Sequence, residues 1–165
     1  MTVPEDYTDH VSAACSVART AAILGDPWSV LLVRDLRTGV HRFDDLAAHL
    51  GIARTVLTRR LTHLVEHGIV ERVDYRDPGC RTRAGYRLTE RGLDLGGVLG
   101  ALMQFGDRHL DEGAGPPMIR RHHGCGARVH QIAVCEVGHR VDRDEDVDLE
   151  PGPGARRTSP RGEPT

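Results

Sequence analysis

Apolar residues recur every three or four positions along much of this chain, and this spacing predicts helices. The pattern indicates a first helix over residues 15–24, which Gly25 is expected to end in the left-handed conformation. A second helix should begin at Pro27, with Asp26 as its cap, and stop at Gly39. Because apolar residues fall on most sides of this second helix, we expect it to be the centre of the core.

Two further helices are expected around a tight turn. Asp44 is the expected cap of a helix over residues 45–50, and Gly51 breaks it. The next helix should run to about His67 and stop at Gly68. Two short helices joined by such a turn are typical of a helix-turn-helix.

Alternation of apolar and polar residues predicts strands after these helices. Residues 69–76 are expected to form a strand, residues 77–79 (Asp-Pro-Gly) a turn, and residues 84–88 the returning strand. A short strand over residues 40–43 is also expected. Thr89 should cap a last long helix that continues to about residue 110. Its apolar stripe consists of Leu93, Val98, Leu99, Leu102 and Phe105.

The order helix, turn, helix, strand, turn, strand is that of a winged helix-turn-helix, so the expected class is α+β and mostly α. We expect this domain to occupy residues 1–112. Residues 113–141 form a His- and Cys-containing extension, for which a β-hairpin is expected. Residues 142–165 are acidic and then rich in Pro, Gly, Arg and Ser, which is typical of a disordered tail.

The second helix of the pair is the expected recognition helix. With Leu57, Leu61 and Leu64 on one side, the opposite side carries threonines and Arg59, which suit base edges in a major groove. The arginines of the predicted wing suit phosphate or minor-groove contacts. The expected DNA-binding residues are Arg54, Thr55, Thr58, Arg59, Arg60, Thr62, Arg81 and Arg83. The alternative is that any amphipathic helix turns polar residues outward, but the helix, the wing and the charge together favour DNA.

Charge and composition narrow the function further. The 165 residues carry a net charge of −2, which argues against a protein that coats nucleic acid over its whole surface. Residues 53–91, however, hold nine Arg against five acids, whereas residues 107–165 hold nine against eleven. Every basic residue is Arg, which suits phosphate and guanine recognition but also reflects a GC-rich genome.

Other classes of protein are disfavoured. The acidic, polar start is unlike a secretory signal, and no apolar run has the length of about 18 residues that a membrane helix needs. Four widely separated cysteines indicate a reducing cytoplasm rather than a disulfide scaffold. There is no phosphate loop, no Gly-x-Ser-x-Gly motif and no carboxylate pair in a plausible cleft, so we expect no enzyme and no required cofactor.

Residues 15–95 resemble the HxlR-type transcriptional regulators, relatives of the MarR class. The resemblance rests on an ordered set of residues: Cys15, Gly25-Asp26-Pro27-Trp28, Arg42-Phe43-Asp44-Asp45-Leu46, Leu57-Thr58-Arg59-Arg60-Leu61, Leu64, Gly68-Ile69-Val70, Arg72, Tyr86-Arg87-Leu88-Thr89 and Gly92. It implies a homodimer, assembled through the N-terminal region and the long last helix, on a palindromic operator in double-stranded DNA. Ala53 stands where the family usually has Ser, so the recognition helix lacks a cap hydroxyl.

The resemblance also implies a sensor. Several relatives sense oxidants or electrophiles through a cysteine at the position of Cys15, where the N-terminus of a helix favours a thiolate. The alternative is that Cys15 is a small buried hydrophobe. Cys80, beside Arg81 and Arg83, is either a second reactive thiol or an incidental loop residue. The inducer itself is not given by the sequence.

The extension holds two clusters of metal-binding residue types. Cys125, Cys135, His139 and either His123 or His130 make a chemically reasonable tetrahedral zinc site. The alternative is a small hairpin flap packed on the last helix.

For the whole chain, the alternative function is that of a winged-helix module that binds proteins and has lost specific DNA binding, although its outward arginines favour DNA.

Overall fold

The structure is a computed structural model that describes residue 3, residues 14–75 and residues 83–156. The chain divides into two compact units. One consists of residues 23–131 and contains the winged helix-turn-helix. The other combines residues 1–22 with residues 132–165, so the division does not coincide with the boundaries expected at 112 and 141. Each unit is described by itself below.

The first two helices begin close to the predicted positions. Helix α1 spans Ser16–Leu24, and helix α2 spans Pro27–Arg37. The Asp26 carboxylate accepts hydrogen bonds from the backbone N–H groups of Trp28 and Ser29 at 3.1 and 3.2 Å, which confirms the predicted cap. Gly25 does not take a positive φ, contrary to expectation, because the chain passes directly into the extended backbone at Asp26.

Helix α2 contributes one stripe, rather than most of its surface, to the core. Leu32, Val33 and Leu36 are buried, whereas Val30 and Leu31 remain half-exposed. These three buried side chains join the leucines of α3 and α4, Ile52, Ile69, Val70 and Leu88 in a single cluster. The prediction that α2 lies at the centre is therefore confirmed for one face of the helix.

Helices α3 (Phe43–Leu50) and α4 (Arg54–Glu66) form the predicted pair. Asp44 is not the cap of α3, because the helix begins at Phe43, two residues before the predicted start, and places Asp44 in its first turn. The strand expected over residues 40–43 is reduced to one bridge between Arg42 and Gly85, since Phe43 already belongs to α3.

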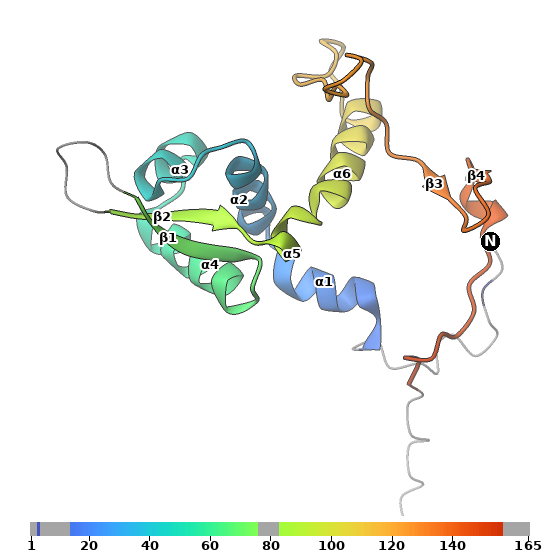
Figure 1. The fold of residues 1–165 in the computed structure, drawn as a ribbon, viewed down its shortest axis with the longest axis horizontal. Coiled ribbons are helices and arrows are strands. Elements are labelled where there is room, and N and C mark those ends of the chain that lie inside the picture. Colours follow the sequence, from blue (N-terminus) through green and yellow to red (C-terminus); the bar gives the residue numbers. More distant parts are fainter. Residues whose placement is uncertain (1–2, 4–13, 76–82, 157–165) are drawn as a thin grey trace, which may run out of the picture. The chain divides into compact units, whose positions relative to one another are not determined.

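The wing consists of strands β1 (Val70–Tyr75) and β2 (Arg83–Leu88), which pair antiparallel from Val70 opposite Leu88 to Tyr75 opposite Arg83. Figure 1 shows this ribbon beside α3 and α4. The predicted turn at residues 77–79 lies outside the described residues. The sheet is further extended by the Tyr86 N–H, which donates to the His41 carbonyl at 2.9 Å.

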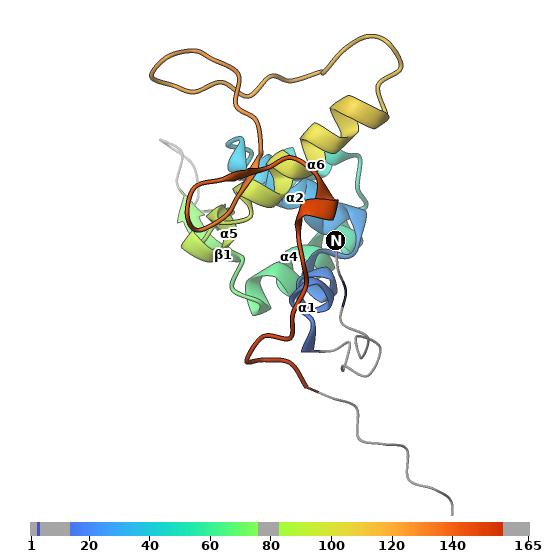
Figure 2. The same cartoon turned by 90° about the vertical axis from the view of Figure 1, so that its right-hand side faces the viewer.

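The last long helix is interrupted. Helix α5 spans Glu90–Leu93 and α6 spans Gly96–His109, with a turn between them that is closed by the Leu95 N–H donating to the Gly92 carbonyl. The Thr89 hydroxyl accepts from the Gly92 N–H at 3.1 Å, as its predicted cap role requires. The interruption falls at residues 94–95, shortly after Gly92, which packs closely against the Ile69 carbonyl. Helix α6, which is labelled in Figure 2, belongs to the same compact unit as α2 and α5.

Helix α6 has a side that packs on the core, an exposed apolar side and a side covered by residues 116–131. Leu95, in the turn before it, and Leu99 pack against the core cluster. Val98, Leu102 and Phe105 are exposed, at spacings of four and three residues that place them on one face. Segment 116–131 lies against a further face, where Gln104 exchanges hydrogen bonds with the Gln131 backbone.

The end of the chain holds a small hairpin. Strands β3 (Ala133–Val134) and β4 (Arg140–Val141) pair antiparallel, so a hairpin is present where the extension was expected to have one. A 3-10 helix, η3, follows at Asp144–Asp146 within the segment expected to be disordered. In the described ranges no helix is long and apolar enough to cross a membrane.

Gly92 offers a test of the packing between α5 and the wing. A Cβ at this residue would overlap the backbone carbonyl of Ile69, which cannot move without disturbing β1. We predict that Gly92→Ala lowers the free energy of unfolding by about 3 kcal/mol, the upper part of the range for overpacking. Urea denaturation measures this change.

Gly97→Ala is the matched control. A Cβ there meets nothing within 4 Å, so this variant should be as stable as the wild type or more stable by up to about 1 kcal/mol. Equal stabilities for the two variants would show that α5 is not packed against Ile69 as described.

Candidate DNA-binding surface

Burial of a leucine stripe fixes the orientation of α4. Leu57, Leu61 and Leu64 are each at most 1% exposed and belong to the core cluster. Burying each of these side chains contributes about 2 kcal/mol, so the helix cannot turn about its axis without a large loss of stability. The residues between these leucines are consequently held on the outside.

The outward face carries the chemistry expected of a recognition helix. Thr55, Thr58, Arg59 and Thr62 are all exposed. Within the described residues the Arg59 guanidinium has no hydrogen bond or ion pair, so its five donors are available to a ligand. The Thr58 hydroxyl donates to the Arg54 carbonyl at 2.9 Å, which leaves its lone pairs and its methyl group accessible.

The turn before α4 sets the angle between the two helices. Gly51 has φ +61 and ψ 26, the left-handed conformation that other residues rarely adopt. Ile52 is 6% exposed and anchors the turn in the core. The predicted role of Gly51 is therefore confirmed.

Helix α4 begins without a side-chain cap. Ala53 has the extended backbone of a cap residue but forms no capping hydrogen bond, as its identity predicted. The first N–H groups of α4 therefore keep their hydrogen-bonding capacity, and the start of a helix attracts anions. This end of α4 suits a DNA phosphate.

Two neighbouring side chains position Arg54 beside the start of α4. Its Nη1 atom lies 2.6 Å from an Asp44 carboxylate oxygen, and its guanidinium lies 4.7 Å from the centre of the Phe43 ring. Both charged side chains are about 70% exposed, so this ion pair adds at most about 1 kcal/mol to stability. The pair positions Arg54 at the edge of the outward face, where its remaining donors are accessible.

Arg60 faces the interior side of α4, contrary to expectation. Its side chain is 26% exposed, and its Nε atom lies 3.1 Å from a carboxylate oxygen of Asp26. Arg60 follows Leu57 by three residues and precedes Leu64 by four, a spacing that puts it on the flank of the buried stripe. We therefore assign Arg60 to the junction between α4 and the start of α2, and remove it from the DNA-binding set.

A buried carboxylate that the sequence did not reveal connects α2 with α3. Asp35 is 1% exposed, and one of its oxygens lies 2.7 Å from the His49 Nδ1 atom. Its other oxygen accepts from the Arg34 guanidinium. A buried carboxylate needs such partners, and removing one would leave an uncompensated charge. The cluster thereby stabilises the position of α3.

Several predicted residues lie outside what the structure describes. Arg81 and Cys80 fall in the undescribed wing tip. Arg83 begins β2, but its side chain is likewise not described. Their proposed contacts with DNA remain predictions.

The cysteines predicted to react or bind metal are exposed. Cys15, Cys125 and Cys135 are free thiols on the surface, so Cys15 is not the buried hydrophobe of the alternative interpretation. The Cys125 Sγ atom lies 3.3 Å from the His122 Nδ1 atom, a neighbour that the sequence analysis did not select. Its spacing of three residues from Cys125 was the available signal.

The predicted zinc ligands are divided between the two units. Cys125 and His123 belong to residues 23–131, whereas Cys135 and His139 belong to the other unit. Across the hairpin turn the Cys135 N–H donates to the His139 carbonyl at 2.9 Å. Among the described residues, no group of three or more potential ligands is gathered in one place.

The winged arrangement and its outward arginine agree with the sequence profile of HxlR-like helix-turn-helix proteins, which matches residues 23–114. The chain belongs to the HxlR-like helix-turn-helix family. An uncharacterized HTH-type transcriptional regulator of Mycobacterium tuberculosis strain H37Rv is 42% identical over 140 residues, which cover 84% of this chain and 87% of the relative. A regulator of the same type from Synechocystis is 34% identical and covers 64% of this chain and 75% of its own length.

Solved structures agree with this HxlR-type assignment. PA1607, described as a candidate transcription factor, has a TM-score of 0.75 at 31% identity and covers 84% of this chain and 96% of its own. The reduced form of the redox regulator HypR has a TM-score of 0.53 at 26% identity and covers 59% of this chain and 95% of its own. The chain is thus a transcriptional regulator of the helix-turn-helix type. Its relatives carry the names of regulators rather than enzymes, in agreement with the sequence analysis.

Proposed function

We propose that this HxlR-type regulator acts in the cytoplasm as a homodimer that reads a palindromic operator through α4. The exposed face of α4, fixed by its buried leucine stripe, supports the proposal most directly. Arg59 is the base-reading residue, because its guanidinium is exposed, has no partner among the described residues and can pair with the O6 and N7 atoms of guanine. Thr55, Thr58 and Thr62 contact neighbouring bases or phosphates, and Arg54 contacts phosphate.

The exposed apolar face of α6 supports the dimer. Val98, Leu102 and Phe105 are 44%, 51% and 59% exposed and form one stripe. Apolar side chains gathered on one helix face mark an interaction surface. A second copy of α6 would cover this stripe by twofold symmetry, and two recognition helices would then meet half-sites about one helical turn apart.

The exposed thiol of Cys15 supports a response to oxidants or electrophiles. Cys15 directly precedes α1, and its carbonyl accepts the first hydrogen bond of that helix, from the Arg19 N–H at 3.0 Å. An exposed thiol is accessible to a reagent in solution. HypR, a structural neighbour, is described as a redox regulator in reduced and oxidized forms. The inducer class proposed here is therefore a thiol-reactive small molecule.

We also propose that the protein binds zinc, because its exposed cysteines and histidines are donor groups of the kinds that zinc prefers. Cys125 with His122 beside it, and Cys135 and His139 at the two ends of a hairpin turn, are thiolate and imidazole ligands of the kinds that zinc prefers. His122 is the better partner of Cys125 than His123 or His130, because its ring nitrogen already contacts the thiol.

Substitution of Arg59 tests base reading. We predict that Arg59→Ala weakens specific operator binding by about 1–3 kcal/mol and relaxes one base position in each half-site. Arg59→Lys keeps the charge but loses the planar fork, so it should preserve non-specific affinity and still lose discrimination. Competition gel shifts at fixed salt measure the ratio of specific to non-specific affinity. An unchanged ratio in both variants would place the reading face elsewhere.

Substitution in α6 tests the dimer. Phe105→Arg puts a charge in the centre of the exposed stripe, and we expect it to yield monomers at concentrations where the wild type is dimeric. Sedimentation equilibrium measures the association. Gly97→Arg is the control, because Gly97 is exposed in open space on a different side of the helix and should leave the dimer intact. A dimeric Phe105→Arg variant would contradict the assigned interface.

The thiol response is tested through Cys15. Cys15→Ser should bind operator DNA like the wild type but remain bound after treatment with diamide or a quinone. The wild type should release the DNA and rebind it after addition of a thiol reductant, since sulfenic acid and disulfide are reversible. Release of DNA by Cys15→Ser but not by Cys80→Ser would assign the response to the wing.

Metal analysis tests the zinc proposal. Protein made without a histidine tag in zinc-replete medium should carry about one zinc per chain. Cys125→Ser and His122→Ala should lose the metal, and His41→Ala, which changes a histidine of the winged region, should keep it. Metal-free wild-type protein would leave the hairpin as a purely structural element.

A further inference from the structure

The segment after α6 folds back as a hairpin loop. The Val129 N–H donates to the Arg120 carbonyl, and the His122 N–H to the Ala127 carbonyl, both at 2.9 Å. Arg121 and Arg128 form a bridge between these bonds. The loop therefore has a defined backbone, which places Arg120 and Arg128 on its adjacent strands.

Gln104 of α6 binds this loop through two hydrogen bonds. Its amide nitrogen donates to the Gln131 carbonyl at 3.1 Å, and its amide oxygen accepts from the Gln131 N–H at 2.9 Å. A side-chain amide thus pairs with the backbone in the manner of a sheet ladder. The face of α6 covered in this way lies opposite the exposed stripe of Val98, Leu102 and Phe105.

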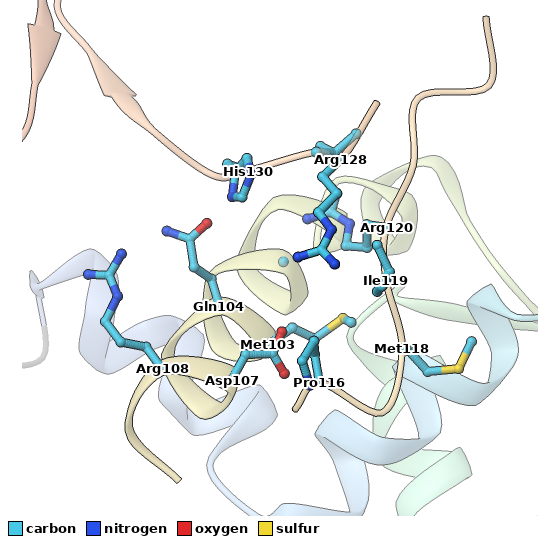
Figure 3. A pocket seen from close by; sticks show the side chains of 12 residues that line it. Met103, Gln104, Asp107, Arg108, Pro116, Met118, Ile119, Arg120, Arg128 and His130 are labelled. Carbon is cyan, nitrogen blue, oxygen red and sulfur yellow. The ribbon is translucent and has the colours of Figure 1, made fainter. Parts of the chain in front are cut away.

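A cavity of about 310 Å³ that is open to solvent lies between this face of α6 and the loop. Figure 3 shows the side chains around it. Its apolar lining includes Met103, Met118, Ile119 and Val129. This volume is at the lower end of the range for small-molecule sites.

The polar part of the lining has an excess of positive charge. Arg120, Arg128 and Arg108 line the cavity, and Asp107 is the one carboxylate among the lining residues. In Figure 3 the guanidinium groups of Arg120 and Arg128 extend over the same central space. Within the part of the chain that the structure describes, neither group has a hydrogen bond or ion pair. Two cations that extend into the same space repel each other, and an anion between them would relieve that repulsion.

The backbone at Gly100 makes room for one of these arginines. A Cβ at Gly100 would overlap the Arg120 Nη1 atom and approach the Gln131 amide nitrogen. The missing side chain thus allows the Arg120 guanidinium to lie directly against α6. Gly97, one turn earlier on the same helix, has nothing within 4 Å of the corresponding position.

We propose that the open cavity between α6 and the loop of residues 116–131 binds a small amphipathic carboxylate, with Arg120 and Arg128 binding the carboxylate and the methionines and aliphatic residues contacting one side of an apolar ring. Guanidinium groups bind carboxylates through paired, charge-assisted hydrogen bonds. A DNA phosphate is a poorer match, because a phosphodiester has no apolar part to fill the rest of the cavity. The site is separate from the exposed face of α4 and does not rest on the proposed DNA binding.

Calorimetric titration of the full chain with 1-naphthoate tests this site, and 1-naphthamide serves as the uncharged analogue. We expect the acid to bind at least about tenfold more tightly than the amide, as a charge-assisted hydrogen bond implies. Arg120→Gln and Arg128→Gln should each weaken naphthoate binding by about tenfold or more. Arg91→Gln, an exposed arginine on α5, is the control for the change in net charge and should bind like the wild type.

A pair of glycine variants tests the geometry without changing any charge. Gly100→Ala should displace the Arg120 guanidinium and weaken naphthoate binding, whereas Gly97→Ala should not. No binding of naphthoate to the wild type, equal binding of acid and amide, or wild-type affinity in both arginine variants would overturn the proposal.

Gel shifts without naphthoate distinguish this site from a DNA contact. All of these variants should bind DNA as the wild type does. Weaker DNA binding by Arg120→Gln and Arg128→Gln would assign the two arginines to phosphate contacts and would also overturn the proposal. The titration needs no DNA, so its result can be interpreted even if the protein does not bind the proposed operator.

Discussion

The burial of three leucines on α4 is the constraint on which the candidate site depends. Leu57, Leu61 and Leu64 lie in a core shared with α2, and each is almost fully buried. Because a helix repeats every 3.6 residues, this stripe determines which residues are turned outward. The threonines and Arg59 therefore face outward as a consequence of leucine packing, and Thr58 also donates to the Arg54 carbonyl within the helix.

Polar contacts around this core position its neighbouring elements. Asp26 caps α2 and also approaches Arg60 of α4, so a single carboxylate links the start of one helix with the side of the other. Asp35, buried in α2, accepts from Arg34 and contacts His49 of α3. The Asp35 contacts are costly to break, because the Asp35 charge would be left buried without a partner. They explain how a small domain holds the angle between α3 and α4 that a recognition helix requires.

Local signals in the sequence were sufficient for most of the fold. Apolar spacing predicted α2 and α4, the cap at Asp26 predicted the start of α2, and Gly51 predicted the turn. The failures have a common cause, which is that they depend on contacts between residues distant in sequence. Phe43 joins α3 rather than a strand, and the long last helix breaks before Gly96, where Gly92 packs against Ile69.

The candidate site, like the fold, was predictable from local residue spacing but not where it depends on contacts between residues distant in sequence. The outward set on α4 follows from the leucine spacing, but Arg60 was misassigned because its partner, Asp26, lies 34 residues away. A stricter use of helical spacing would have placed Arg60 on the flank of the stripe. The paired arginines of the cavity gave no sequence signal at all, since the hairpin loop and the Gln104–Gln131 contact bring them to α6.

The central claim is that α4, oriented by its buried leucines, reads a twofold-symmetric DNA site. Sequencing the fragments that the purified protein selects from a random DNA pool, at a stated salt concentration, tests this claim most directly. We expect an enriched palindrome whose half-sites lie about one helical turn apart. Retention of DNA with no enriched sequence would contradict it, because only non-specific phosphate contacts would then remain.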